Sequence, residues 1–294
     1  MKRRGEQSGA EPRKHPALEQ VSTLLAEGDS LADFDSRQLH ISLQALEKAI
    51  CLNQESRLRY SDEPLKFQQS EEELYNAILR FKAVPEEAEM QVVQSAGLEN
   101  LVGLLGHENL DLGNCALEVL LDWCEGDTPI ATAMLERLCS LELLSALITL
   151  LTRLHLSSDR DSEVLYNALS LLECIFTAKP ELLSGQPAAQ LAKWTLEQLA
   201  TAEDTFSTNK LYLVETLASI LSQPSNYQTL TELKGVEIVL KSILSHSNRE
   251  PEGKDEKEFL ANLFDCLSSL LLHPTALEVF RRLEGLSALT QLLR

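Results

Sequence analysis

Residues 224–240 read PSNYQTLTELKGVEIVL, and this stretch decides the fold. It begins with Pro224, has a glycine eleven residues later at Gly235, and continues as an apolar helical pattern to Leu240. Proline is favoured in the first turn of a helix, because its fixed φ and missing N–H cost nothing there. Glycine just after a helix permits a sharp turn. The stretch therefore predicts a short helix that ends near Gly235 and a second, apolar helix after it.

The same pattern recurs along the chain. Prolines lie at positions 85, 129, 180, 224 and 274, so neighbouring prolines are 44 to 51 residues apart. Glycines follow two of the other prolines at Gly97 and Gly285, and the apolar segments 141–151 and 188–199 take the same place in the remaining two units without a glycine. A period of roughly 40 to 47 residues is typical of helical repeats. The sequence therefore predicts an array of similar helical units.

Each unit has room for a third helix. Apolar helical patterns at about 109–124, 159–177, 207–222 and 255–272 supply it. Three helices per repeat, with a short first helix turned sharply into the second, indicate armadillo repeats rather than two-helix repeats. A coiled coil is the simpler alternative for a Leu-rich acidic helical chain, but five proline breaks and the lack of sustained heptads argue against it. We predict an all-α fold, an armadillo-type right-handed helical solenoid with an N-terminal helical cap.

The organisation before the repeats differs from the repeats themselves. Residues 1–16 are polar and basic with almost nothing apolar, so we expect a disordered basic tail. Helical spacing of apolar residues, such as Leu39, Leu43 and Leu46, then predicts a helical cap over 17–84. Armadillo-type repeats follow over 85–294, and the last one is incomplete because the sequence ends inside a second helix. Such an end exposes apolar surface, so we expect either a fragment of a longer protein or another chain that covers this end.

Composition narrows the class of partner. The net charge of −19 opposes broad attraction to nucleic acid or anionic lipid, so we expect no direct nucleic-acid binding and no membrane partner. The apolar runs are too short to span a bilayer. The six cysteines lie mostly inside apolar helical patterns, which favours reduced thiols in the nucleus or cytosol.

The sequence offers no constellation of catalytic residues. Its six histidines are spread one to a region, no Cys-x-x-Cys motif occurs, and the glycines at 97, 103 and 106 lie in and around an apolar helix rather than in a phosphate-binding loop. We therefore expect no enzymatic activity, no cofactor and no metal site.

Several segments resemble the beta-catenin-like protein family, a nuclear armadillo-repeat group associated with the spliceosome. The matching segments are LLGHEN (104–109), NKLY (209–212), NLFD (262–265), EGL (284–286) and, before the repeats, LRY (58–60) with Pro64, Lys66 and Phe67. The resemblance covers roughly residues 40–294 in the family's order. It implies association with the spliceosome's NineTeen complex and binding of basic, nuclear-localisation-type segments of splicing factors. Members of the family are nearly twice as long as this chain, and the tail here lacks a long acidic run.

The basic tail is itself a candidate signal. Clustered basic residues at a terminus resemble a short bipartite nuclear-localisation signal, which an import receptor would recognise. The residues of this candidate signal are Lys2, Arg3, Arg4, Arg13 and Lys14. Solubility or chance is the alternative explanation of such a cluster.

A candidate peptide groove comes from the third helices, which line the concave face in armadillo solenoids. Aligned on their apolar positions, they place Glu118, Asp122, Ser170, Cys174, Glu215, Ser219, Asp265 and Ser269 where importin-type proteins carry Trp and Asn. Carboxylates there would attract Lys and Arg but would lack aromatic walls around the side-chain stems. The alternative is a solvated acidic helix face.

The preferred hypothesis is a non-catalytic nuclear scaffold for protein interaction in pre-mRNA splicing. Its partners would be splicing factors with basic segments, together with import receptors. The alternative is a cytosolic armadillo-like or HEAT-like regulatory scaffold or co-chaperone, and an enzyme with a dispersed active site is a third class.

Overall fold

A computed structural model describes residues 36–84, 86–126, 128–155, 158–201, 205–247 and 250–292. Every regular element within these ranges is helical, and none of these residues lies in a strand. The chain divides into two compact units, Met1–Gln91 and Val92–Arg294. The predicted all-α solenoid class is thereby confirmed. The tail residues 1–16 and the first part of the predicted cap lie outside the described residues.

The first unit is a helical hairpin in its described part. It consists of α2 (Ser36–Arg59), α3 (Pro64–Leu79) and the 3-10 turn η2 (Arg80–Ala83), with α4 (Glu86–Val93) at the division between the units. Leu46 and Ile78 are fully buried between the helices. Asn53 donates a hydrogen bond from α2 to Ser70 Oγ on α3 at 3.1 Å. The turn between these helices is formed by the family-like segment that starts at Leu58.

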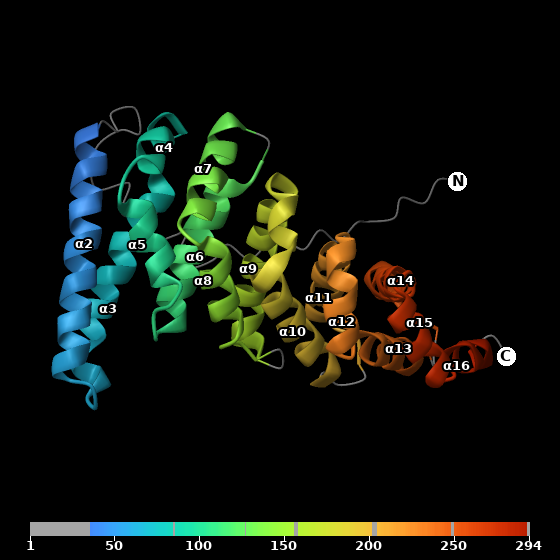
Figure 1. Cartoon of the computed structure of the whole chain (residues 1–294). Helices are drawn as coiled ribbons and strands as arrows, with labels where there is room; N and C mark the ends of the chain where they lie inside the picture. Colours follow the sequence, from blue (N-terminus) through green and yellow to red (C-terminus); the bar gives the residue numbers. More distant parts are fainter. Residues whose placement is uncertain are drawn as a thin grey trace, which may run out of the picture. The chain divides into compact units, whose positions relative to one another are not determined.

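The second unit contains the repeats, which follow one another in chain order in Figure 1. The second helices are α5 (Gly97–Leu104), α8 (Leu143–Leu151), α10 (Gly185–Thr201), α13 (Gly235–His246) and α16 (Gly285–Gln291). The third helices are α6 (Leu110–Cys124), α9 (Asp159–Ala178), α11 (Thr208–Leu221) and α14 (Gly253–Leu270). The predicted third helices thus match the structure to within a few residues.

The first helices are more variable than the sequence predicted. They are α4, α7 (Pro129–Ser140), η4 (Pro224–Asn226) continuing into α12 (Tyr227–Glu232), and α15 (Pro274–Arg282). At Pro180 the expected short helix is instead a single 3-10 turn, η3 (Pro180–Leu183). Gly185 follows with a φ of 80°, a left-handed conformation that glycine adopts without strain. The chain turns there directly into the long helix α10.

Second helices pack on second helices, and third helices on third helices, from each repeat to the next. The third helices pack in consecutive pairs, α6 on α9, α9 on α11 and α11 on α14, while α5, α8, α10 and α13 do the same for the second helices. Leu117 and Leu213 on the third helices are fully buried, as is Phe259, whose ring packs on His246 of α13. Each such side chain contributes about 1.5–3 kcal/mol of hydrophobic stabilisation. In the last helix, α16, Leu286 is 71% exposed. No described helix is on its own long and apolar enough to cross a bilayer. Taken together, α14 and α15 would be, by length and composition alone, but they are bent by 115° relative to each other.

The glycine between the first and second helices has a different role from the predicted one. The left-handed residues are Lys234 and Glu284, each one position before the glycine, with φ values of 63° and 53°. Gly235 is the first residue of its helix, and a Cβ there would lie 2.7 Å from the carbonyl oxygen of Leu230. At Gly285 a Cβ would lie 2.1 Å from the Phe280 ring. The glycine is therefore needed because the helices approach closely, and the turn itself is made by the preceding residue.

Gly235→Ala should lower the free energy of unfolding by about 1–3 kcal/mol, since the added methyl group overlaps a backbone oxygen. Gly103→Ala is the matched control, because a Cβ there meets nothing within 4 Å in the helix α5. It should raise the free energy of unfolding by roughly 0.5–1 kcal/mol through helix propensity. Urea denaturation of both variants measures the difference, and equal midpoints would show that the approach at Gly235 is not tight.

Candidate functional site

The predicted groove residues lie on four consecutive third helices. Because these helices pack in chain order, equivalent positions follow one another along one face of the second unit. All eight side chains are half-buried or exposed, and they are Glu118 and Asp122 on α6, Ser170 and Cys174 on α9, Glu215 and Ser219 on α11, and Asp265 and Ser269 on α14. We call the surface that they form with their neighbours on these helices the third-helix face.

The first part of this face belongs to a hydrogen-bond network between repeats. Asn167 on α9 is buried and donates to Asn114 Oδ1 on α6 at 3.1 Å. Asn114 in turn donates to Glu118 Oε1 at 2.8 Å. One repeat further on, Asn209 donates to Ser162 Oγ at 2.9 Å and links α11 to α9. Glu118 therefore orients a side chain that holds the register of α6 and α9.

Glu215 has acidic neighbours on the third-helix face. Burial raises the pKa of its carboxyl group, and the nearby carboxylates of Glu258 and Glu173 raise it further. These three glutamates come from three consecutive third helices, α11, α14 and α9. Like charges so close together make the ionised form less favourable, and a bound cation would relieve the repulsion. The alignment of third helices identified Glu215 but missed Glu173 and Glu258.

Two tyrosines lie beside this acidic cluster. The rings of Tyr166 on α9 and Tyr212 on α11 have centroids 5.3 Å apart and planes tilted by 53°. Burial is the main cause that raises the pKa of the Tyr212 hydroxyl, and Tyr166, Glu215 and Asp255 add to it. Tyr166 is 47% exposed. The aligned positions themselves carry no aromatic residue, and the two tyrosines lie about one helical turn before Ser170 and Glu215.

Tyr212 is the last residue of the family-like segment NKLY (209–212), so the sequence did contain a signal that pointed to it. In it, Asn209 makes the bond to α9 already described, and Lys210 is buried and donates to the carbonyl oxygen of Thr205. The same motif that holds the repeat in place thus also presents Tyr212 to the third-helix face. Tyr166 lies in none of the family-like segments, so the sequence did not point to it.

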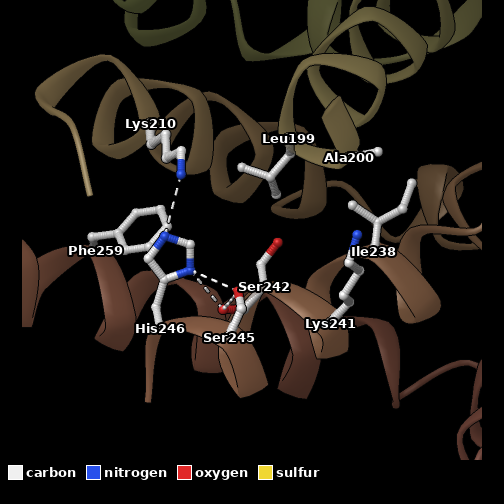
Figure 2. Close-up of a pocket in the computed structure, with 9 residues that line it drawn as sticks. All are labelled: Leu199, Ala200, Lys210, Ile238, Lys241, Ser242, Ser245, His246 and Phe259. Carbon is white, nitrogen blue, oxygen red and sulfur yellow. Dashed lines mark hydrogen bonds between the residues drawn. The ribbon is translucent and has the colours of Figure 1, made fainter. Parts of the chain in front are cut away.

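A small cavity of about 50 Å³ lies where α10, α11, α13 and α14 meet, and Figure 2 shows its lining. Lys210 Nζ points at His246 Nε2, 3.3 Å away. His246 Nδ1 lies 2.9 Å from the carbonyl oxygen of Ser242, which can only accept, so this nitrogen carries the hydrogen and Nε2 accepts from Lys210. The ring of Phe259 packs on His246 with centroids 5.0 Å apart. These contacts tie α11 to α13 and α14.

The LLGHEN segment is a second tie between repeats. The Arg153 guanidinium donates to the carbonyl oxygens of His107 at 2.6 Å and Glu108 at 3.1 Å, across more than forty residues of chain. His107 Nδ1 accepts from the backbone N–H of Asn109, and the Asn109 side chain caps α6 by accepting from Asp111 N. His107 is thus part of the turn that starts α6.

The buried thiols are poor nucleophiles at neutral pH. Burial raises the pKa of Cys266 to about 12, with a smaller effect from Asp265. Burial also raises the pKa of Cys124 far above its usual value, and Cys174 and Cys139 add to the effect. Because the thiolate is the reactive form, these side chains act as core residues. The basic cluster Lys2, Arg3, Arg4, Arg13 and Lys14 lies outside the described residues.

The fold and the third-helix face define an Arm-type all-helical repeat protein. Residues 17–294 match the family model described as "Catenin-beta-like, Arm-motif containing nuclear", and the chain belongs to this family. It is 29% identical over 268 residues to beta-catenin-like protein 1 of Homo sapiens and of Rattus norvegicus, covering 88% of this chain and 47% of each relative. The Schizosaccharomyces pombe homolog is 30% identical over 247 residues, covering 82% of this chain and 44% of the relative.

The chain spans about half the length of the curated relatives that it matches. An engineered protein of known crystal structure covers 85% of this chain with a TM-score of 0.46 and 19% identity, which is too distant to bear on function.

Glu215→Gln should stabilise the protein at neutral pH. The folded-state pKa of Glu215 is raised, so its ionised form is less favourable in the folded than in the unfolded chain and lowers stability above that pKa. The penalty disappears as the pH falls through the raised pKa and both states become protonated. We expect a higher melting temperature for Glu215→Gln at pH 7 and a difference that shrinks toward about pH 4.

Glu136→Gln, at an exposed position on the first helix α7, is the control for this measurement. Thermal melts of both variants across this pH range measure the effect. An equal gain from Glu136→Gln would show that net charge, rather than the local cluster, sets the effect.

Proposed function

We propose that this chain is a non-catalytic nuclear scaffold whose third-helix face binds Lys/Arg-rich segments of partner proteins in pre-mRNA splicing. The observation that supports the proposal most directly is the convergence of Glu173, Glu215 and Glu258 from three successive helices. Carboxylates held close together favour a cationic ligand, since binding it lowers their mutual repulsion.

The family supports the nuclear part of the proposal, because it is described as nuclear. The resemblance to spliceosome-associated members suggests splicing factors with basic segments as partners, and the basic tail suggests import receptors. A scaffold role agrees with the structural use of Lys210, His246 and His107 and with the raised pKa values of the buried thiols.

The binding test replaces three carboxylates of the third-helix face. Glu215→Gln, Glu258→Gln and Asp265→Asn together remove charge while nearly keeping side-chain shape. Exposed ion pairs contribute about 0.5 kcal/mol each, so we expect roughly a tenfold loss of affinity for a fluorescent Lys/Arg-rich peptide. The salt dependence of binding should become flatter as well. Fluorescence anisotropy at several salt concentrations measures both.

The control variant removes three exposed glutamates from the first helices and turns. Glu136→Gln, Glu181→Gln and Glu278→Gln together remove three negative charges, as the test variant does. These residues lie on α7, η3 and α15, away from the third-helix face. Binding by the control should match the wild type. If both variants lose affinity equally, net charge alone attracts the peptide, and if neither does, the partner docks elsewhere.

Nuclear accumulation is tested separately. Changing Lys2, Arg3 and Arg4 together to Ala should reduce nuclear accumulation of a fusion too large to diffuse through nuclear pores, because the candidate signal loses three of its five basic residues. Fluorescence microscopy of the two fusions measures the ratio of nuclear to cytoplasmic signal. An unchanged ratio contradicts the signal, and exclusion of the unaltered fusion from the nucleus would favour the cytosolic scaffold.

A further inference from the structure

Tyr166 is a large aromatic residue that the second unit leaves 47% exposed. Its ring packs on that of Tyr212 in the neighbouring repeat, with centroids 5.3 Å apart. This contact restricts the orientation of the Tyr166 ring. A pre-positioned aromatic ring loses little conformational entropy on binding and offers a large contact area. The pair therefore forms a ready platform on the third-helix face.

Acidic side chains lie near this platform. Glu215 and Asp255 both raise the pKa of the Tyr212 hydroxyl, after burial and Tyr166, and Glu258 and Glu173 are charged neighbours of Glu215. An aromatic face with carboxylates beside it attracts a cation through two effects, the ring quadrupole and direct charge pairing. An apolar or anionic group would gain neither.

We propose that Tyr166 and Tyr212, together with Glu215, form the subsite that receives one arginine of a partner segment and selects it over lysine. A guanidinium is planar, stacks on an aromatic face and pairs with a carboxylate through two parallel N–H donors. An ammonium is a compact, strongly hydrated charge that gains less from the ring. This inference rests on the proposed function and adds a preference that charge alone does not give.

The test compares two peptides of equal length and charge, one with arginine and one with lysine at every basic position. Tyr166→Leu removes the ring, Tyr166→Phe keeps it, and Tyr227→Leu removes a tyrosine from the first helix α12 as a control. We expect wild type to bind the arginine peptide more tightly. Tyr166→Leu should lose about threefold to tenfold in affinity for that peptide and much less for the lysine peptide. Tyr166→Phe and Tyr227→Leu should keep the wild-type preference.

The deciding quantity is the ratio of the affinities for the arginine and lysine peptides. Partial unfolding of a variant weakens the binding of both peptides alike and leaves this ratio unchanged. An equal ratio in wild type and Tyr166→Leu overturns the inference. If the variant with Glu215→Gln, Glu258→Gln and Asp265→Asn loses binding but Tyr166→Leu leaves the ratio of the two affinities unchanged, the proposed function stands and the tyrosine subsite is wrong. If wild type binds neither peptide, both the proposed function and the subsite fail.

Discussion

The repeat unit cannot bury its apolar surface by itself, and the rest of the second unit follows from this constraint. Each second and third helix packs on its counterpart in the next repeat, so the core is continuous along the chain. Within a repeat the turn from the first to the second helix is tight, so Gly235 lies against the backbone of Leu230 and Gly285 against the ring of Phe280, with no room for a Cβ. The turn itself is made by a left-handed residue just before the second helix, Lys234 or Glu284, and Glu142 has the same conformation before α8, where no glycine follows.

Side-chain hydrogen bonds then fix how neighbouring repeats are placed. Arg153 bonds to backbone oxygens of the preceding repeat, Asn167 to Asn114, and Asn209 to Ser162. Buried polar groups are costly when unpaired, so such bonds favour one register over others that would bury the same apolar area. Several residues of the family-like segments act in this way. Their resemblance to the family therefore reflects the packing of repeats as much as binding.

The same alignment of third helices produces the candidate interaction surface. Helices that are held in register bring Glu173, Glu215 and Glu258 together although they lie on separate repeats. Burial, and after it the neighbouring Glu258 and Glu173, raise the pKa of Glu215, which means that the folded chain keeps a carboxylate where its ionised form is unfavourable in the absence of a ligand. Such a local conflict with stability is typical of functional surfaces. The exposed ring of Tyr166 at the edge of the cluster fits the same interpretation.

The sequence by itself determined the all-helical class, the three-helix repeats and their approximate boundaries, because proline spacing and apolar periodicity depend only on local geometry. It also placed Glu215 and Asp265 on the third helices. Only the tertiary structure decided that η3 replaces a helix after Pro180, that the glycines serve close approach, and that Tyr166 meets Tyr212. The reason is that these features depend on how whole helices are placed, within a repeat for η3 and the glycines and between repeats for the tyrosines. Packing of the full core sets this placement, and no short stretch of sequence encodes it.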